Sequence, residues 1–327
     1  MSIADRSVND RSSAPRYSII MAAYNQADFV REALDSLFAQ TFKDFEVIVC
    51  DDGSTDETPR VIREYSDRVT LLTSDHRGPA GARNFAIAVA KGEFISCMDS
   101  DNVWMPWTLE CIDEAVQQYG PECLVYLIRT PMEFTQMIKI ERVKTRMEVY
   151  PDFFSAPEYA SHGAALIGAI PRQRFIAAGQ FFEGLITDED LDLVLRLGNL
   201  SPYVMIMEPI TMLNRSHFSN LSQDRSLLYQ SSMRIVEREL KDHVYPGGRS
   251  YIKKRRWRLA RLMSARCIRF SNKAQFRLGL SLYMKSFRLF CTGSYIGFLW
   301  TFPLYVMMQL IMARYGLRHA TQTMPPD

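Results

Sequence analysis

Short apolar runs alternate with segments of helical periodicity along the first 120 residues. Four runs of five or six mostly apolar residues have the length and composition of buried strands, at positions 17–22, 45–50, 69–73 and 94–98. Between and after these runs, helical apolar spacing or alanine-rich composition predicts helices over 29–38, 78–90 and 105–119. This alternation predicts an α/β fold, with right-handed crossovers and a mainly parallel sheet flanked by helices.

Two of the predicted strands end in acidic residues. Asp51 and Asp52 follow the second strand, and Asp99 and Asp101 follow the fourth in the run Asp-Ser-Asp. Ligands of open α/β sheets lie beyond the carboxyl ends of the strands, where clustered carboxylates need a cation or hydrogen bonds. Mg²⁺ or Mn²⁺ held by one or two carboxylates usually carries a substrate diphosphate as well. The sequence therefore suggests a metal–diphosphate site.

Turns and helix caps produce the same acidic patterns and are the alternative interpretation. Ser54 and Glu57 have the spacing of a capping box, which predicts that a helix begins directly after the first acidic pair. Taken alone, neither acidic run shows whether its carboxylates cap a helix or bind a ligand.

Six segments around these residues resemble, in order and spacing, the nucleotide-sugar-binding half of inverting family 2 glycosyltransferases. The segments are 21–25, 36–42, 51–56, 77–84, 91–95 and 99–104. A weaker resemblance follows in 170–182, in 188–197, which is similar to the family's E-D-x-D-L-x-x-R-L helix, and in 215–222. The resemblance covers roughly residues 17–222 apart from 132–160, and it departs from the family at Ala22-Ala23, where Pro-Thr is frequent.

The resemblance implies a GT-A, Rossmann-like fold and transfer of a sugar from a nucleoside diphosphate to an acceptor hydroxyl, with inversion. The donor would be a nucleotide sugar, by default a UDP-sugar, and the acceptor a glycan or glycolipid. Ala22, Tyr24 and Asp52 would form the base pocket, in which the Asp52 carboxylate accepts the uracil N3–H. Asp99 and Asp101 would hold a divalent metal (Mn or Mg) and the ribose–diphosphate, with Asp101 as the direct ligand.

Two further residues receive donor-site roles from the resemblance. Arg83 would assist at the diphosphate, or would instead pair with a nearby acid for structural reasons. His217 would donate to the diphosphate or complete the metal site on a closing loop, whereas the alternative is an ordinary exposed loop histidine.

The resemblance makes Asp190 the general base that deprotonates the acceptor hydroxyl. Its acidic neighbours Asp188, Glu189 and Asp192 leave the register open. An acidic first turn of a helix, favoured by the helix dipole, also explains the cluster, and both interpretations can hold together.

The net charge of +2 hides a strong asymmetry along the chain. Residues 1–242 contain 24 basic and 36 acidic side chains, whereas residues 243–326 contain 15 basic and no acidic ones. Residues 289–313 are uncharged, and their length could span a bilayer. Pro303 and several polar or glycine residues equally favour a tilted or interfacial helix hairpin, and simple packing on the catalytic domain is the third alternative. We expect an anionic membrane surface as a partner and no nucleic acid, because no recognition motif accompanies the charge.

The spacing of the cysteines and the composition of the first 15 residues indicate the cellular compartment of the protein. The six cysteines show no metal-binding spacing and suit reduced thiols of a cytoplasmic protein, which would be peripheral to or anchored in the inner face of the cell membrane. Residues 1–15 are polar and are expected to be disordered rather than a signal peptide. The predicted domains are therefore a GT-A domain over 16–225 and a basic helical region over 226–327.

The sequence favours a metal-dependent inverting glycosyltransferase. A catalytically inactive nucleotide-sugar or glycan-binding protein, or a membrane scaffold, is the alternative, and the intact acids Asp52, Asp99, Asp101 and Asp190 argue against it. A nucleotidyltransferase would need a glycine-rich triphosphate loop near the first strand, which residues 22–26 do not provide. Absence of the Q-x-x-R-W signature of processive relatives favours transfer of single sugars.

Overall fold

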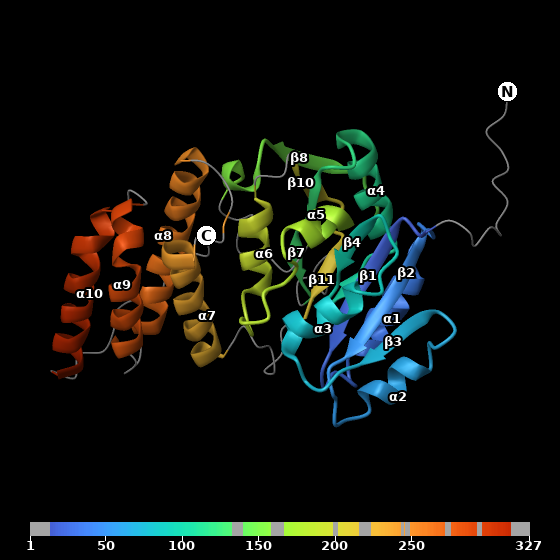
Figure 1. Cartoon of the computed structure of the whole chain (residues 1–327), viewed down its shortest axis with the longest axis horizontal. Coiled ribbons are helices and arrows are strands. Elements are labelled where there is room, and N and C mark those ends of the chain that lie inside the picture. Colours follow the sequence, from blue (N-terminus) through green and yellow to red (C-terminus); the bar gives the residue numbers. More distant parts are fainter. Residues whose placement is uncertain are drawn as a thin grey trace. The chain divides into compact units, whose positions relative to one another are not determined.

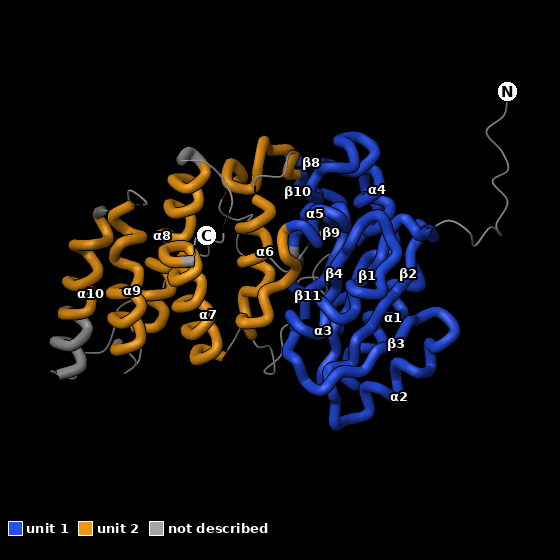
Figure 2. The backbone as a smooth tube through the Cα atoms, in the orientation of Figure 1, with its two compact units in different colours: residues 1–148, 165–177, 204–215 blue, residues 149–164, 178–203, 216–327 orange. Residues whose placement is uncertain are grey.

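The computed structural model describes residues 14–132, 140–157, 167–198, 202–215, 224–242, 245, 249–271, 276–292 and 296–314. The chain forms two compact units, shown in different colours in Figure 2. Unit 1 comprises residues 1–148, 165–177 and 204–215, and unit 2 comprises residues 149–164, 178–203 and 216–327. The domain limits expected from the sequence remain predictions.

The main sheet has eight strands in the order β3-β2-β1-β4-β9-β6-β10-β8. Figure 1 labels β1, β2, β3 and β4 of this sheet. Its strands are β1 Tyr17–Ala23, β2 Phe45–Asp51, β3 Val69–Thr73, β4 Phe94–Cys97, β6 Leu124–Leu127, β8 Arg146–Tyr150, β9 Ile167–Pro171 and β10 Tyr203–Glu208. The first four strands pair in parallel, whereas β9 pairs antiparallel with β4 and β6. A second sheet has the order β5-β11-β7 and consists of β5 Val103–Trp104, β11 Met212–Asn214 and β7 Arg129–Pro131.

Continuous apolar composition places β1, β2 and β4 in the middle of unit 1. Ile19, Val49 and Ile95 are fully buried, as expected for parallel strands covered on both faces by helices. The helices of this unit are α1 Val30–Phe38, α2 Thr58–Arg63, α3 Gly78–Ile87, α4 Thr108–Tyr119 and α5 Arg172–Ala177. Helix α3 packs on β1 and β2. The predicted α/β fold with a mainly parallel sheet is confirmed.

Two predicted helix starts are wrong by a few residues. Helix α4 begins at Thr108 rather than at residue 105, because a residue before proline disfavours helical geometry and Met105 precedes Pro106. The Met105 N–H instead donates to the Thr211 carbonyl at 2.8 Å. Helix α2 has Glu57 at its N-cap and no capping side chain, so the expected capping box is absent. Proline in its first turn sets the start instead.

Unit 2 is mainly helical. Its elements are the short turn η2 Phe153–Ser155, the helices α6 Glu189–Leu197, α7 Arg225–Glu237, α8 Arg249–Ser271, α9 Phe276–Thr292 and α10 Ile296–Arg314, and the π-helix η5 Arg238–Asp242. The uncharged stretch is divided between the end of α9 and α10. No helix in the part of the chain that the structure describes is both long and apolar enough to cross a membrane.

Aromatic rings join the last two helices. Tyr283 of α9 stacks on Phe302 of α10 with ring centroids 4.9 Å apart. Phe290 of α9 meets Phe298 of α10 edge to face, with centroids 5.0 Å apart. These contacts fix one face of α10 against α9.

We expect Gly92→Ala to destabilise the protein, because a Cβ at this position would lie 2.5 Å from the backbone nitrogen of Ser18 in β1. Relief requires movement of a central strand, which costs about 1–3 kcal/mol. The midpoint of urea unfolding followed by circular dichroism measures the loss. Gly297→Ala is the matched control, because a Cβ there meets nothing within 4 Å. Equal midpoints for the two variants would contradict the close approach of residue 92 to β1.

Candidate active site

The loops that follow β1 and β2 are linked by side chains that accept backbone N–H groups. Asn25 has a left-handed φ of 51°, and its N–H donates to Ser54 Oγ at 3.0 Å. The Asn25 side chain in turn accepts from the Thr55 N–H at 2.9 Å. Ser54 therefore holds the β1 loop instead of capping α2, which explains the missing capping box.

Asp56 strengthens the same link between the two loops. Its carboxylate accepts the N–H groups of Thr58 at 2.9 Å and of Ala27 at 3.1 Å. Partial burial disfavours the charged form, but these bonds outweigh it and lower the pKa of Asp56 below its ordinary value. The ionised carboxylate thus fixes the entrance to both loops.

Asp52, directly after β2, is 3% exposed and organises the loop between β3 and α3. Its Oδ1 accepts from the Ser74 hydroxyl at 2.5 Å and from the Arg77 N–H at 2.7 Å. Its Oδ2 accepts from the Gly78 N–H at 2.8 Å. Gly78 has a φ of +78°, a conformation that favours glycine. Asp52 therefore holds the start of α3 at the carboxyl edge of β1 and β2.

Tyr24, directly after β1, presents an aromatic ring at this edge. The residue is 42% exposed, and its ring lies against the ring of His76 with centroids 4.2 Å apart. His76 Nδ1 lies 3.2 Å from the Asp52 carbonyl oxygen and 3.4 Å from Asp52 Oδ2. Ala22, half-buried in β1, pairs with Cys50 of β2. His76 was not predicted as a site residue, because no ligand spacing marks it in the sequence.

Asp99, which follows β4, is held on both carboxylate oxygens. Arg83 of α3 donates to Asp99 Oδ1 at 2.7 Å, and the Asn102 amide donates to Oδ2 at 3.4 Å. Arg83 is buried on one face of α3, so its guanidinium is directed at the end of β4. The structure thus brings two of the predicted site residues into direct contact.

Asn102 connects this carboxylate to a distant strand. Asn102 is fully buried, and its side-chain oxygen accepts from the Asn214 amide of β11 at 3.0 Å. Neither asparagine was predicted as a site residue, although Asn102 adjoins the Asp-Ser-Asp run. The next segment, 216–223, contains His217 and lies outside the described residues.

The donor set at the end of β4 fits a divalent cation that arrives with a diphosphate. Asp101 is half-exposed on the loop after β4, two residues from Asp99. Mg²⁺ commonly uses one or two carboxylates and completes its oxygen shell with substrate phosphates and water. Within the described ranges, no three His, Cys, Asp or Glu side chains gather to hold a metal by themselves. Arg83 forms an ion pair with Asp99 at 2.7 Å, so the carboxylate nearest the end of β4 is already matched by one positive charge.

Asp190 lies in unit 2, in the first turn of α6, and is half-buried. Its Oδ1 accepts from the Leu191 N–H at 2.6 Å. A carboxylate in the first turn of a helix is favoured by the positive end of the helix dipole. The acidic cluster is therefore the start of a helix, as one of the two interpretations of the sequence predicted.

Two of the neighbouring acids form ion pairs within unit 2. Asp188 receives two hydrogen bonds from Arg266 of α8, at 2.7 and 2.8 Å. Asp192 is fully buried and accepts from Arg196 at 2.9 Å, from Arg238 at 2.8 Å and from the Tyr245 hydroxyl at 2.6 Å. These partners give Asp188 and Asp192 a structural role on either side of Asp190.

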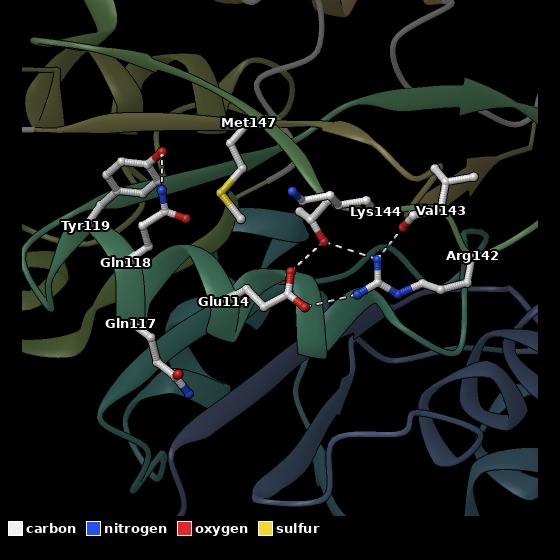
Figure 3. A pocket seen from close by; sticks show the side chains of 9 residues that line it. Glu114, Gln117, Gln118, Tyr119, Arg142, Val143, Lys144 and Met147 are labelled. Atoms are coloured by element: carbon white, nitrogen blue, oxygen red, sulfur yellow. Dashed lines mark hydrogen bonds and ion pairs between the residues drawn. The ribbon is translucent and has the colours of Figure 1, made fainter.

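An open hollow of about 1010 Å³ lies elsewhere in unit 1, beside α4 (Figure 3). Its polar groups bind one another: Arg142 donates to Glu114 at 3.0 Å and to Thr145 at 3.1 Å. Gln118 donates to the Tyr119 hydroxyl at 2.9 Å. No predicted site residue lines this hollow. We therefore assign no chemistry to it.

Comparison with known proteins gives a family match for the first half of the chain. Residues 18–166 match the model of Glycosyl transferase family 2. An uncharacterised glycosyltransferase of Rickettsia felis is 28% identical over 69% of this chain and 39% of its own length. The UDP-Glc:alpha-D-GlcNAc-diphosphoundecaprenol beta-1,3-glucosyltransferase WfaP of Escherichia coli is 43% identical over 27% of this chain and 36% of its own length. The aligned region thus spans well under half of either relative.

Solved structures show the same fold. S. aureus TarS 1-349 in complex with UDP-GlcNAc matches with a TM-score of 0.62 at 18% identity, over 85% of this chain and 81% of that one. The mannosyltransferase PcManGT of Pyrobaculum calidifontis, in complex with GDP-Man and Mn²⁺, matches with a TM-score of 0.54 at 19% identity, over 94% and 88% of the chains. The predicted GT-A-like fold is confirmed.

We expect Asp52→Asn to loosen the loop between β3 and α3. An amide removes one acceptor oxygen and turns a donor toward N–H or O–H groups, which costs about 1–3 kcal/mol. Amide hydrogen exchange in the peptide covering residues 74–80 should become faster. Asp75→Asn is the control, because Asp75 is exposed in the same loop. Unchanged exchange in the Asp52 variant would show that the carboxylate does not hold this loop.

Proposed function

Residues 18–166 form a Glycosyl transferase family 2 domain, and we propose that the whole chain transfers a sugar from a nucleoside diphosphate to an acceptor hydroxyl. The anomeric centre would be inverted. The observation that carries this proposal is the arrangement at the end of β4, where Arg83 and Asn102 fix Asp99 beside Asp101. A positively charged group and two carboxylates at the carboxyl edge of a parallel sheet suit a diphosphate and its cation.

The nucleobase would bind between the loops that follow β1 and β2. Tyr24 offers an exposed aromatic face, and Ala22 precedes it by two residues, near the end of β1. An ionised carboxylate offers about four acceptor sites, and three donors already occupy sites on Asp52. Oδ1 holds two of these donors, and His76 Nδ1 lies 3.4 Å from Oδ2. We assign the remaining acceptor site, on Oδ2, to an imide N–H such as that of uracil.

The diphosphate would bind next to Asp101 and Arg83. We propose Asp101 as the carboxylate that holds Mn²⁺ or Mg²⁺, with Asp99 positioned by Arg83 for the ribose–diphosphate. When bound, such a cation stabilises the negative charge that develops on the leaving diphosphate. The likeness to a mannosyltransferase structure that contains Mn²⁺ supports this assignment. We propose His217 as the third metal ligand.

Asp190 is our proposed general base. It would accept the proton of the acceptor hydroxyl as the oxygen attacks the anomeric carbon from the face opposite the diphosphate. The ion pairs of Asp188 and Asp192 support this choice, because both of those carboxylates are engaged by arginine. The helix dipole favours the ionised form that a base requires.

We propose a lipid-linked glycan as the acceptor and a UDP-sugar as the donor. The relative WfaP of Escherichia coli uses UDP-Glc and an acceptor linked to diphosphoundecaprenol, as its name states. A structure of S. aureus TarS contains UDP-GlcNAc. These likenesses support the class of donor and acceptor.

We expect Asp101→Asn to abolish the metal dependence of nucleotide binding. Calorimetric titration of UDP, GDP, CDP and dTDP with and without Mn²⁺ identifies the preferred diphosphate. Mutation of a residue that hydrogen-bonds to a metal ligand lowers metal affinity by about 10–100-fold. Loss of a direct ligand should therefore weaken diphosphate binding in the presence of Mn²⁺ by about 100-fold or more. Asp67→Asn, a change at an exposed carboxylate, is the control. Failure of folded wild type to bind any diphosphate would overturn the proposed transferase function.

We expect Asp190→Asn to remove transfer while leaving donor binding intact. General base catalysis contributes about 10²–10⁴-fold, so kcat should fall within that range. Asp192→Asn should instead lower the melting temperature. It removes the negative charge that pairs with two buried arginines, Arg196 and Arg238. Transfer of sugar from the preferred UDP-sugar to a lipid diphosphate-linked acceptor is the assay. An active Asp190 variant would remove this residue from the mechanism.

A further inference from the structure

Helix α10 is apolar all round yet exposes one face to solvent. No charged residue occurs between Arg288 and Arg314. Phe298 and Phe302 cover the inner face, whereas Trp300 is 75% exposed, Leu304 61% and Met307 54%. The spacing i, i+4 and i+7 places these three exposed side chains on one face of the helix. A helix without a polar face is normally buried, so this face needs a covering surface.

The exposed face of α9 combines apolar and basic side chains. Leu280 is 39% exposed, Met284 63% and Phe287 45%, again at spacing i, i+4 and i+7. Arg277 and Arg288 lie on the same face at helical spacing and are also exposed. Buried residues such as Leu282 and Leu289 occupy the opposite face. Both terminal helices thus carry an exposed apolar stripe. We name these six side chains the α9–α10 face: Leu280, Met284, Phe287, Trp300, Leu304 and Met307.

The charged side chains that α9 and α10 themselves contribute are all basic, and the one acidic group paired with them in the described part of the chain is Glu237 of α7, whose carboxylate lies 3.7 Å from Lys285 Nζ. Residues 243–326 contain 15 basic and no acidic side chains. The structure records no acidic partner for Arg269, Arg277 or Arg288 among the residues it describes. Basic side chains beside aromatic and aliphatic ones are typical of helices that lie in the headgroup region of anionic membranes. Trp300, with an apolar ring and a polar N–H, suits that boundary.

We propose that the α9–α10 face docks on the surface of an anionic lipid bilayer, with α9 and α10 lying in the interface. A second copy of the chain fits less well, because a two-fold interface pairs the same surface patch with itself and would bring the arginines of both copies together. Docking goes beyond the proposed sugar transfer and does not require it.

Vesicle flotation tests the docking of the full-length protein. The probes are vesicles of phosphatidylcholine alone and of phosphatidylcholine with phosphatidylglycerol at roughly 7:3. We expect the wild type to float with the anionic vesicles and to stay behind with the neutral ones. The triple variant Trp300→Ser, Leu304→Ser, Met307→Ser should bind the anionic vesicles at least about tenfold more weakly, because its buried apolar area is lost.

A matched control removes apolar side chains of similar exposure from unit 1. Val143→Ser with Ile176→Ser changes residues that are 47% and 46% exposed and should bind like the wild type. Arg277→Glu with Arg288→Glu should lose binding to the anionic vesicles while keeping the wild-type melting temperature, because both side chains are exposed. Equal binding by the triple variant and the wild type would overturn the proposal.

Tryptophan fluorescence gives a second readout that does not depend on loss of binding. Emission should shift to shorter wavelength when anionic vesicles are added, and Trp300→Phe should remove most of the shift. Trp257→Phe is the control, because Trp257 lies on α8 and its ring is paired with Arg261 at 5.0 Å. A shift that disappears with Trp257 instead would overturn the assignment of the docking face.

Sedimentation velocity separates the alternative occupant. We expect the wild type to remain monomeric without vesicles at micromolar concentration. A dimer that the Trp300, Leu304 and Met307 substitutions dissociate would show that a second copy covers the face, and would overturn the proposal. The triple variant should lose vesicle binding but bind UDP as the wild type does. Vesicle flotation therefore tests the docking proposal, and UDP binding separately tests the transferase proposal.

Discussion

Compensation of buried carboxylates is the constraint on which both units depend. A carboxylate withdrawn from water is strongly destabilising unless hydrogen bonds or opposite charges surround it. Asp52 meets this requirement with one hydroxyl and two backbone N–H groups, and so fixes the loop before α3. Asp192 meets it with two arginines and a tyrosine, and so ties α6 to the segments that follow α7. The groups that bind each buried carboxylate therefore also fix the backbone segments that carry them.

The same constraint anchors one acid two residues from the proposed metal ligand and another two residues from the proposed general base. Asp99 is bound by Arg83 and Asn102, and Asp101 follows it two residues later. In α6, Asp190 precedes the fully buried Asp192 by two residues. Residues two apart on a helix point in different directions, so one acid can anchor the helix while the other faces outward. In each unit, an anchored carboxylate therefore lies two residues from the residue that we propose as metal ligand or general base.

The two proposals together describe transfer at a lipid surface. A sugar acceptor carried by a membrane lipid is confined to the bilayer, and an enzyme docked there meets it at a raised effective concentration. The exposed apolar stripes of α9 and α10 and their single-sign charge suit such docking. The basic side chains of α9 and α10 would repel each other between two copies of the chain, but they attract anionic lipid headgroups.

The sequence by itself determined the fold class and the order of the elements around the donor site. Apolar runs too short for helices fixed the first four strands to within a residue or two, because parallel strands buried on both faces tolerate few polar side chains. The ordered motifs identified the family, which the comparison confirmed over residues 18–166. The roles of Asp101 and Asp190 rest on the same motifs.

Only the tertiary structure decided which side chains meet. Asn102 binds Asn214 across 112 positions, and His76 lies on Tyr24 across a loop, so no local spacing could reveal either pair. Arg238, 46 residues from Asp192, and Arg266, 78 residues from Asp188, bind these two acids, and no local spacing could reveal either pair. The face of α10 that stays exposed was likewise undetermined, because an all-apolar helix has no polar side to mark it. Periodicity encodes local structure, whereas contacts between distant segments depend on how the whole chain packs.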